Sequence, residues 1–243
     1  MKNYVLIFFV SLLAVGCQSQ DMVVIQGKKI PIFDSSSEYF HDSIKARLNK
    51  MDTTLLPLHF LAYTHFIQRT ASFNPQVLDD KASEMYEANE QGDYEKALEK
   101  GREILKDSPN NITALKEIGY AYKKLGKMDS VPIYFTLMVK AIEGAKLSGD
   151  GGVDSPYVLT NWFELRSLIE ATSGLYASKK ALFKDSKGRL IGLAMVESPK
   201  MGRFGVFNHW MNYLKPGDYQ EGDFFSEQDL KTQLKIDYQG KRR

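Results

Sequence analysis

The sequence contains a single cysteine, Cys17, among its 243 residues. One thiol cannot form an internal disulfide, and it excludes a metal site that needs two or more thiolates. The histidines do not supply a zinc site either, because His59 and His65 are six residues apart on one expected helix and point in different directions. We therefore expect no metal centre and no cofactor.

Motifs for nucleophilic catalysis are also missing. There is no Gly-x-Ser-x-Gly elbow, and no Ser-x-x-Lys stands near a convincing set of partners. The glycine-rich run 148–156 lacks the lysine and trailing hydroxyl of a phosphate loop, and it lacks the ligand series of an EF-hand. We expect this run to be a structured turn, and we assign no catalytic residue.

Neither sign of charge dominates the chain. Its 32 basic and 30 acidic side chains leave a formal net charge of +2. Such a balance provides no broad basic field, so we expect no binding to nucleic acid. The sequence is 43% hydrophobic and 12% aromatic, which is enough for a folded core.

The N-terminus has the pattern of an export signal. Lys2 precedes a short, mostly apolar run that begins at Val5 and ends before Cys17. A helix that spans a membrane needs roughly 20 residues, so this run fits a signal peptide better than a membrane helix.

The segment Leu13-Ala14-Val15-Gly16-Cys17 resembles the lipobox of bacterial lipoproteins, although alanine stands where leucine is more common. The resemblance implies cleavage before Cys17 and acylation of its thiol, which would leave no thiol for catalysis. The residue after the cysteine is Gln18 rather than an aspartate, as in lipoproteins that are sorted to the outer membrane. The alternative is an ordinary secretory signal with a chance cysteine.

The rest of the chain divides into segments of different composition. After a signal peptide at 1–16, we expect a lipidated tether at 17–37 and a helical part at 38–147. A small β-rich part packed on the helices follows at 148–215, and a polar tail ends the chain at 216–243. The fold class is therefore α+β, with N-terminal helical hairpins followed by a small, mainly antiparallel sheet and one helix.

Short elements are expected before the middle of the chain. Residues 23–32 favour a strand. Ser37 is expected to cap a helix over 38–51, and a second helix with Pro57 in its first turn is expected to run to about Thr70. The second helix should bury an apolar face that includes His65 and Phe66.

The middle of the chain resembles a pair of tetratricopeptide repeats, at about 79–140. Gly92 and the residues that follow it, including Ala97, match the turn and second helix of one unit, and Pro109 ends it. The same frame returns at Gly126, which is 34 residues later and equals the period of the repeat. Arrays of this kind usually need three or more units, so neighbouring elements must cap the pair.

The first helices of such repeats often line a groove that binds peptides. In this frame five residues would face it: Tyr86, Asn89, Lys116, Tyr120 and Lys123. Two tyrosines and two lysines would suit an acidic or C-terminal peptide. The alternative is a solvated face that packs against neighbouring elements of the same chain.

The C-terminal part changes to β-type patterns. A short strand is expected at 157–160 and an amphipathic helix at 161–171. Two strands follow at 177–184 and 190–197, joined by a hairpin turn, and a third begins at Arg203. A last helix is expected at 226–235.

Four features together resemble one uncharacterised family of exported bacterial lipoproteins that is known as a domain of unknown function. They are Asp52-Thr53-Thr54-Leu55, Phe73-Asn74-Pro75, the repeat-like pair, and Ser148-Gly149-Asp150-Gly151. The resemblance covers about residues 38–214. It implies one domain with a helical front and a β-rich back, and it supplies no substrate or catalytic residue.

Two functions of different class remain open at this point. The first is a non-enzymatic interaction module of the cell envelope, held at the outer membrane by its lipid and binding an envelope protein or peptide. The second is an envelope hydrolase or small-ligand receptor, with a site at the seam between the helical and β-rich parts.

Overall fold

A computed structural model describes residues 22–152, 154–184, 190–200, 202–208, 224–225 and 232. The expected signal peptide, Cys17 and nearly all of the polar tail lie outside these residues. So do the turn expected between the strands at 177–184 and 190–197, and most of the last expected helix.

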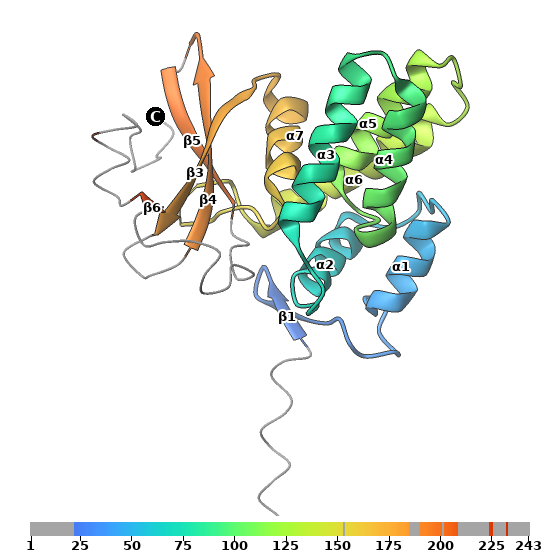
Figure 1. The fold of residues 1–243 in the computed structure, drawn as a ribbon. Coiled ribbons are helices and arrows are strands. Elements are labelled where there is room, and N and C mark those ends of the chain that lie inside the picture. Colours follow the sequence, from blue (N-terminus) through green and yellow to red (C-terminus); the bar gives the residue numbers. More distant parts are fainter. Residues whose placement is uncertain are drawn as a thin grey trace, which may run out of the picture.

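The described chain combines helices with two small sheets (Figure 1). The helices are α1 (His41–Asn49), α2 (Pro57–Ile67), α3 (Pro75–Glu90), α4 (Tyr94–Asp107), α5 (Ile112–Lys124), α6 (Val131–Ser148) and α7 (Trp162–Ser173). The strands are β1 (Met22–Ile25), β2 (Lys28–Pro31), β3 (Ala177–Lys184), β4 (Leu190–Ser198), β5 (Gly202–Asn208) and β6 (Phe224–Phe225). Helix α7 lies between the larger sheet and the other helices. The structure thus confirms a mixed architecture of helices and small antiparallel sheets.

The segment expected as one strand at 23–32 is a hairpin of two. Strands β1 and β2 pair antiparallel, with Ile25 opposite Lys28. The two turn residues Gln26 and Gly27 both have positive φ, 49° and 79°, as the tight turns of two-residue hairpins require. Only the glycine adopts this conformation without cost, so the sequence signals the turn at Gly27 but not at Gln26.

Helix α1 starts later than the sequence suggested. Its N-cap is Phe40, which has no side-chain cap, and the expected cap by Ser37 is wrong. The Ser37 hydroxyl accepts a hydrogen bond from the backbone N–H of Tyr39 at 3.0 Å, so it stabilises a turn that precedes the helix. A serine can satisfy either arrangement, and local sequence does not separate them.

Helix α2 is buried on most of its surface. It has Pro57 at its N-terminus, as expected, and ends at Ile67 rather than Thr70. The Thr70 hydroxyl donates to the Ile67 carbonyl at 2.8 Å beyond the helix end. Because α1 and α6 both pack on α2, its burial is not one-sided, and the expected inward residues His65 and Phe66 are only half-buried. The buried residues are His59, Phe60, Leu61, Ala62, Tyr63, Thr64 and Ile67.

Helices α3 to α6 form two hairpins with short connections. Gly92 and Gly126 stand in the two turns with φ of 78° and 72°, a region that favours glycine. Asn74 and Asn111 cap α3 and α5 through their side-chain oxygens. Helix α4 packs between α3 and α5, with its Gly101 against Ile118. The apolar residues of these helices form a second buried cluster beside the larger one around α2.

The larger sheet has the strand order β5-β4-β3-β6. Strands β3, β4 and β5 pair antiparallel, and their bounds agree with the expected strands. Strand β6 adds a short parallel pairing to β3 that the sequence did not indicate. The strand expected at 157–160 is wrong, because this segment forms only a single bridge at Tyr157 before α7.

Candidate functional site

The structure brings together three of the five residues expected to line a groove. Tyr86 and Asn89 lie on α3, and Lys116 lies on α5, which packs against α3. Asn89 is buried, and its amide donates to a carboxylate oxygen of Glu117 at 2.8 Å. Tyr120 lies one turn beyond Lys116 on α5 and is 38% exposed. Lys123 lies one turn further and is exposed as well.

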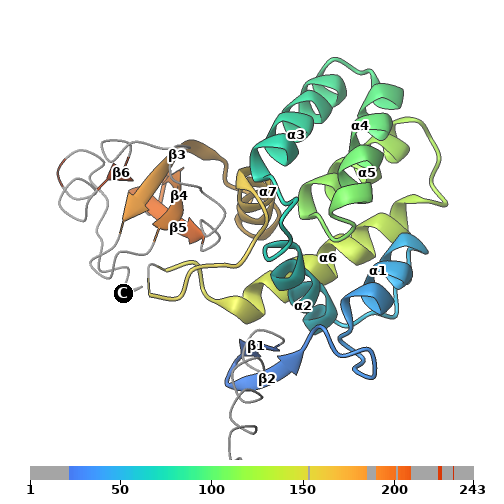
Figure 2. The same ribbon diagram turned by 60° about the horizontal axis from the view of Figure 1, so that its bottom comes forward.

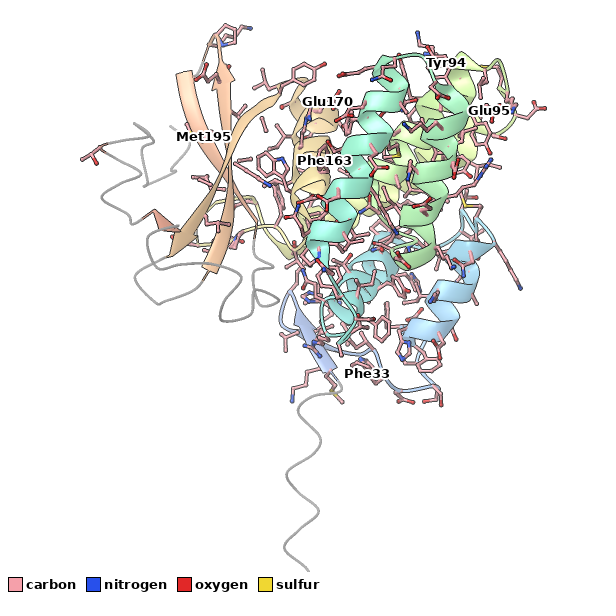
Figure 3. The ribbon with its side chains drawn as sticks, in the orientation of Figure 1. Phe33, Tyr94, Glu95, Phe163, Glu170 and Met195 are labelled. Atoms are coloured by element: carbon pink, nitrogen blue, oxygen red, sulfur yellow. The ribbon has the colours of Figure 1, made fainter. Side chains whose placement is uncertain are left out.

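A helix of the same chain covers part of the surface where the groove was expected. Helix α7 packs against both α3 and α5, on the surface where a partner peptide was expected (Figures 1 and 2). Figure 3 shows Phe163 and Glu170 on α7 beside α3. The apolar side of α7, with Leu165 and Leu168, enters the larger buried cluster. On the side that contacts α3 and α5, Phe163 packs against the second buried cluster, and Ser167 and Glu170 make the polar contacts.

Lys116 is the centre of the polar contacts between α7 and the groove. Its ammonium group donates to the Tyr86 hydroxyl at 2.7 Å and contacts a carboxylate oxygen of Glu117 at 3.0 Å. It also forms an ion pair with Glu170 of α7. The Lys116 side chain is only 14% exposed, so one buried cation is shared among two carboxylates and a phenol. We call the set Tyr86, Lys116, Ser167 and Glu170 the latch.

Tyr86 joins the cation to the buried hydroxyls of the latch. Its hydroxyl lies 3.2 Å from the Ser167 hydroxyl, which lies 2.9 Å from that of Thr113. The Tyr86 ring also packs under the Arg166 guanidinium, whose central carbon is 4.8 Å from the ring centroid. Stacking of a cation on an aromatic face adds to the attraction between α7 and α3.

The chain of groups Ser167, Tyr86 and Lys116 has the residue types of a nucleophile with its bases. Its electrostatics oppose that chemistry. Burial alone would lower the pKa of Lys116, but the Glu117 carboxylate, the Tyr86 hydroxyl and the Glu170 carboxylate outweigh burial and raise it. Burial together with Glu117 raises the pKa of Tyr86. A general base needs a pKa near the working pH, and Ser167 is fully buried, so the latch holds structure rather than performing this chemistry.

The N-termini of α5 and α7 interlock beside the latch. The Glu164 carboxylate accepts hydrogen bonds from the backbone N–H of Ile112 at 2.8 Å and of Thr160 at 2.7 Å. It also accepts one from the Thr160 hydroxyl at 2.6 Å. Asn161 caps α7 itself. Burial raises the pKa of Glu164, and these three hydrogen bonds act in the opposite direction. The positive ends of two helices thus meet at one buried carboxyl group.

A second carboxyl group joins α3 to α7. Asp79 of α3 is buried, and its side chain accepts a hydrogen bond from the backbone N–H of Phe163 at 3.1 Å. Burial raises the pKa of Asp79 to about 6, although the hydrogen bond from Phe163 and the charge of Lys180 act in the opposite direction. The group therefore titrates at a higher pH in the folded chain than in the unfolded chain.

Asp79→Asn should change how stability depends on pH. The folded state binds the Asp79 proton more tightly than the unfolded state, so the contribution of this group falls as pH rises from about 4 to 6. Over that window we expect the wild-type chain to lose about 2–3 kcal/mol of unfolding free energy relative to Asp79→Asn. Denaturant unfolding across the window measures the difference. Asp80→Asn, on the exposed neighbour, controls for removal of a carboxylate from α3, and equal curves for wild type and Asp79→Asn would contradict the assignment.

His41 and His59 make ring and backbone contacts within the helical part. His41 stacks flat on Phe66, with ring centroids 3.9 Å apart, and His59 accepts a hydrogen bond from the backbone N–H of Leu56. Burial lowers the pKa of His59. Among the residues that the structure describes, no cluster of His, Cys, Asp or Glu side chains could hold a metal ion. His209 lies outside them.

A family model described as domain of unknown function DUF4919 matches residues 28–185. The chain belongs to the DUF4919 family. The match runs from the start of β2 to one residue beyond β3, so the latch and both interlocked helix ends are part of the DUF4919 domain. No curated protein and no solved structure matches the chain. Within the described part of the chain, no helix has the length and apolar character needed to cross a bilayer.

Proposed function

We propose that this DUF4919 protein is a lipid-anchored interaction module of the cell envelope. The lipobox-like segment ending at Cys17 supports cleavage before that residue and its acylation. The anchor would place the domain at the outer membrane, on either its periplasmic or its outer face. The glycine spacing between Gly92 and Gly126 supports tetratricopeptide-like units for the two helical hairpins.

The occupied groove is the observation that carries the proposal. Helices α3 and α5 contact α7 through Tyr86 and Lys116. The Tyr86 hydroxyl is hydrogen-bonded to that of Ser167, and the Lys116 ammonium forms an ion pair with Glu170. This surface therefore binds a helical segment with a carboxylate within its own chain. Repeat proteins bind partners on the corresponding face, and in this chain α7 covers part of that face.

The end of the groove that α7 leaves exposed offers the same chemistry to a partner. Tyr120 is 38% exposed, and the Lys124 ammonium lies 5.3 Å from the centroid of its ring. Lys123 is exposed on the same helix. One tyrosine and two lysines suit an acidic or C-terminal peptide, whose carboxylate would replace water around the ammonium groups.

The test is crosslinking of the intact protein in cells, followed by mass spectrometry of what it holds. The double variant Tyr120→Ala/Lys123→Glu should lose a partner that the wild-type chain captures reproducibly. The matched control is Tyr176→Ala/Lys45→Glu, which changes an exposed tyrosine and an exposed lysine elsewhere. It should keep the partner.

Two results would contradict this function. Equal capture by both double variants would dismiss the exposed end of the groove as the binding surface. A small ligand that co-purifies in place of any protein partner would favour the receptor expected as the alternative.

A further inference from the structure

The β1–β2 hairpin has one buried face and one exposed face. Val23, Ile25 and Ile30 point into the larger buried cluster and are at most 5% exposed. The alternate residues Met22 and Val24 point outward and are 41% and 65% exposed. The outward residues of a surface strand are usually polar, so two apolar side chains in this position call for an explanation.

Basic side chains accompany the exposed apolar ones. Lys29 stands directly opposite Val24, so both side chains project from the exposed face. Lys28 stands opposite the buried Ile25 at the turn, and it is exposed there. Phe33, just beyond β2, is 38% exposed. The nearest following carboxylate, Asp34, accepts hydrogen bonds from the backbone N–H and the hydroxyl of Ser36. These hydrogen bonds lower its pKa, so one negative charge stays next to Phe33, against the two lysines. We call Met22, Val24, Lys29 and Phe33 the hairpin face; Lys28 lies at its edge, beside the turn.

The hairpin face lies next to the proposed anchor in the chain. Met22 follows Cys17 by five residues, which span at most about 18 Å when fully extended. In Figures 1 and 2 the hairpin lies at the margin of the molecule, and in Figure 3 Phe33 lies on the same side. An acyl chain at Cys17 would therefore hold this face within reach of the bilayer surface.

We propose that the hairpin face rests on an anionic phospholipid surface, a contact that depends on the proposed acylation of Cys17. Met22, Val24 and Phe33 would enter the headgroup region, and Lys28 and Lys29 would pair with lipid phosphates. One acyl group and one basic, apolar patch together hold a protein more firmly than either alone. The contact would also orient the domain. The C-terminal end of α5, where Tyr120 and Lys123 are exposed, lies away from β1 and would therefore point away from the bilayer (Figure 1).

The experiment uses the full-length protein purified from membranes and reconstituted in vesicles of equal parts phosphatidylethanolamine and phosphatidylglycerol. Val24→Cys is labelled with an environment-sensitive fluorophore, which is specific because acylation blocks the native thiol of Cys17. Met128→Cys, an exposed apolar position in the loop between α5 and α6, is the matched control. The mass of the purified protein reports the acyl chains.

The probe at Val24 should shift to shorter wavelength and be quenched by lipids that carry a spin label, whereas the probe at Met128 should do neither. Lys28→Glu/Lys29→Glu should reduce the shift, and vesicles of phosphatidylcholine alone should reduce it as well. An acylated protein whose Val24 probe is as solvent-exposed as the Met128 probe overturns the hairpin contact and leaves the anchor standing. A mass without acyl chains overturns both.

Discussion

Glu164→Ala should lower the free energy of unfolding by about 3–5 kcal/mol. The substitution removes one carboxylate that accepts from Ile112, and twice from Thr160. Both donor residues are buried, at 2% and 0% exposure, so water cannot replace the lost acceptor without a rearrangement. A buried donor left without an acceptor costs about 1–3 kcal/mol, and in this variant three donors lose their acceptor at once.

Denaturant unfolding of the purified domain gives the size of this effect. Glu143→Ala is the matched control, because Glu143 is an exposed glutamate on α6, and it should change stability by less than about 1 kcal/mol. Glu164→Gln keeps one acceptor oxygen, which can still accept from Thr160, and presents its N–H₂ group to the Ile112 N–H, so it should recover part of the loss. If Glu164→Ala were as stable as Glu143→Ala, the two helix ends would not depend on this carboxyl group.

Lys116→Met should cost a similar amount, about 3–5 kcal/mol, for a different reason. The ammonium group is the cation that both Glu117 and Glu170 contact, and the Glu117 side chain is only 7% exposed. Methionine fills the space of the lysine stem but leaves a buried carboxylate without its cation. Lys116→Met/Glu117→Gln should recover part of the lost stability, because it removes the stranded charge as well.

Hydrogen exchange would show where the stability is lost in Lys116→Met. We expect faster exchange in α7, since its Glu170 loses the cation that holds it to α5. Lys45→Met, on an exposed lysine of α1, should leave exchange in α7 unchanged. Faster exchange throughout the chain, with no preference for α7, would argue against the latch as a local contact.

Sequence reasoning succeeded where the deciding information was local. The spacing of Gly92 and Gly126 placed Tyr86 and Lys116 on neighbouring helices, and the structure joins them by a hydrogen bond. That their surface binds a partner stays a prediction. The strand-like segments 177–184 and 190–197, with a turn between them, predicted two strands, and the structure has both with nearly these bounds. Turn residues and short apolar segments act over a few residues, which is the range that a single sequence exposes.

Sequence reasoning failed where partners are distant in the chain. Ser167 and Glu170 reach Tyr86 from 81 and 84 residues away, and no periodicity links the two segments. Asn161 and Glu164 have the spacing of a helix cap, so a local role for Glu164 could have been inferred. Its hydrogen bond to Ile112, on another helix, could not, because the sequence does not say which helix ends meet.

The packing of α7 on α3 and α5 must come late in the folding of each chain. Synthesis delivers the chain from its N-terminus, so the residues of α3 and α5 are made before those of α7. Contacts inside a hairpin close quickly, whereas the latch must wait for a loop of some 80 residues to close. Every newly made chain therefore passes through an interval in which Tyr86 and Lys116 are uncovered, and whatever reaches them first during that interval competes with the chain's own helix.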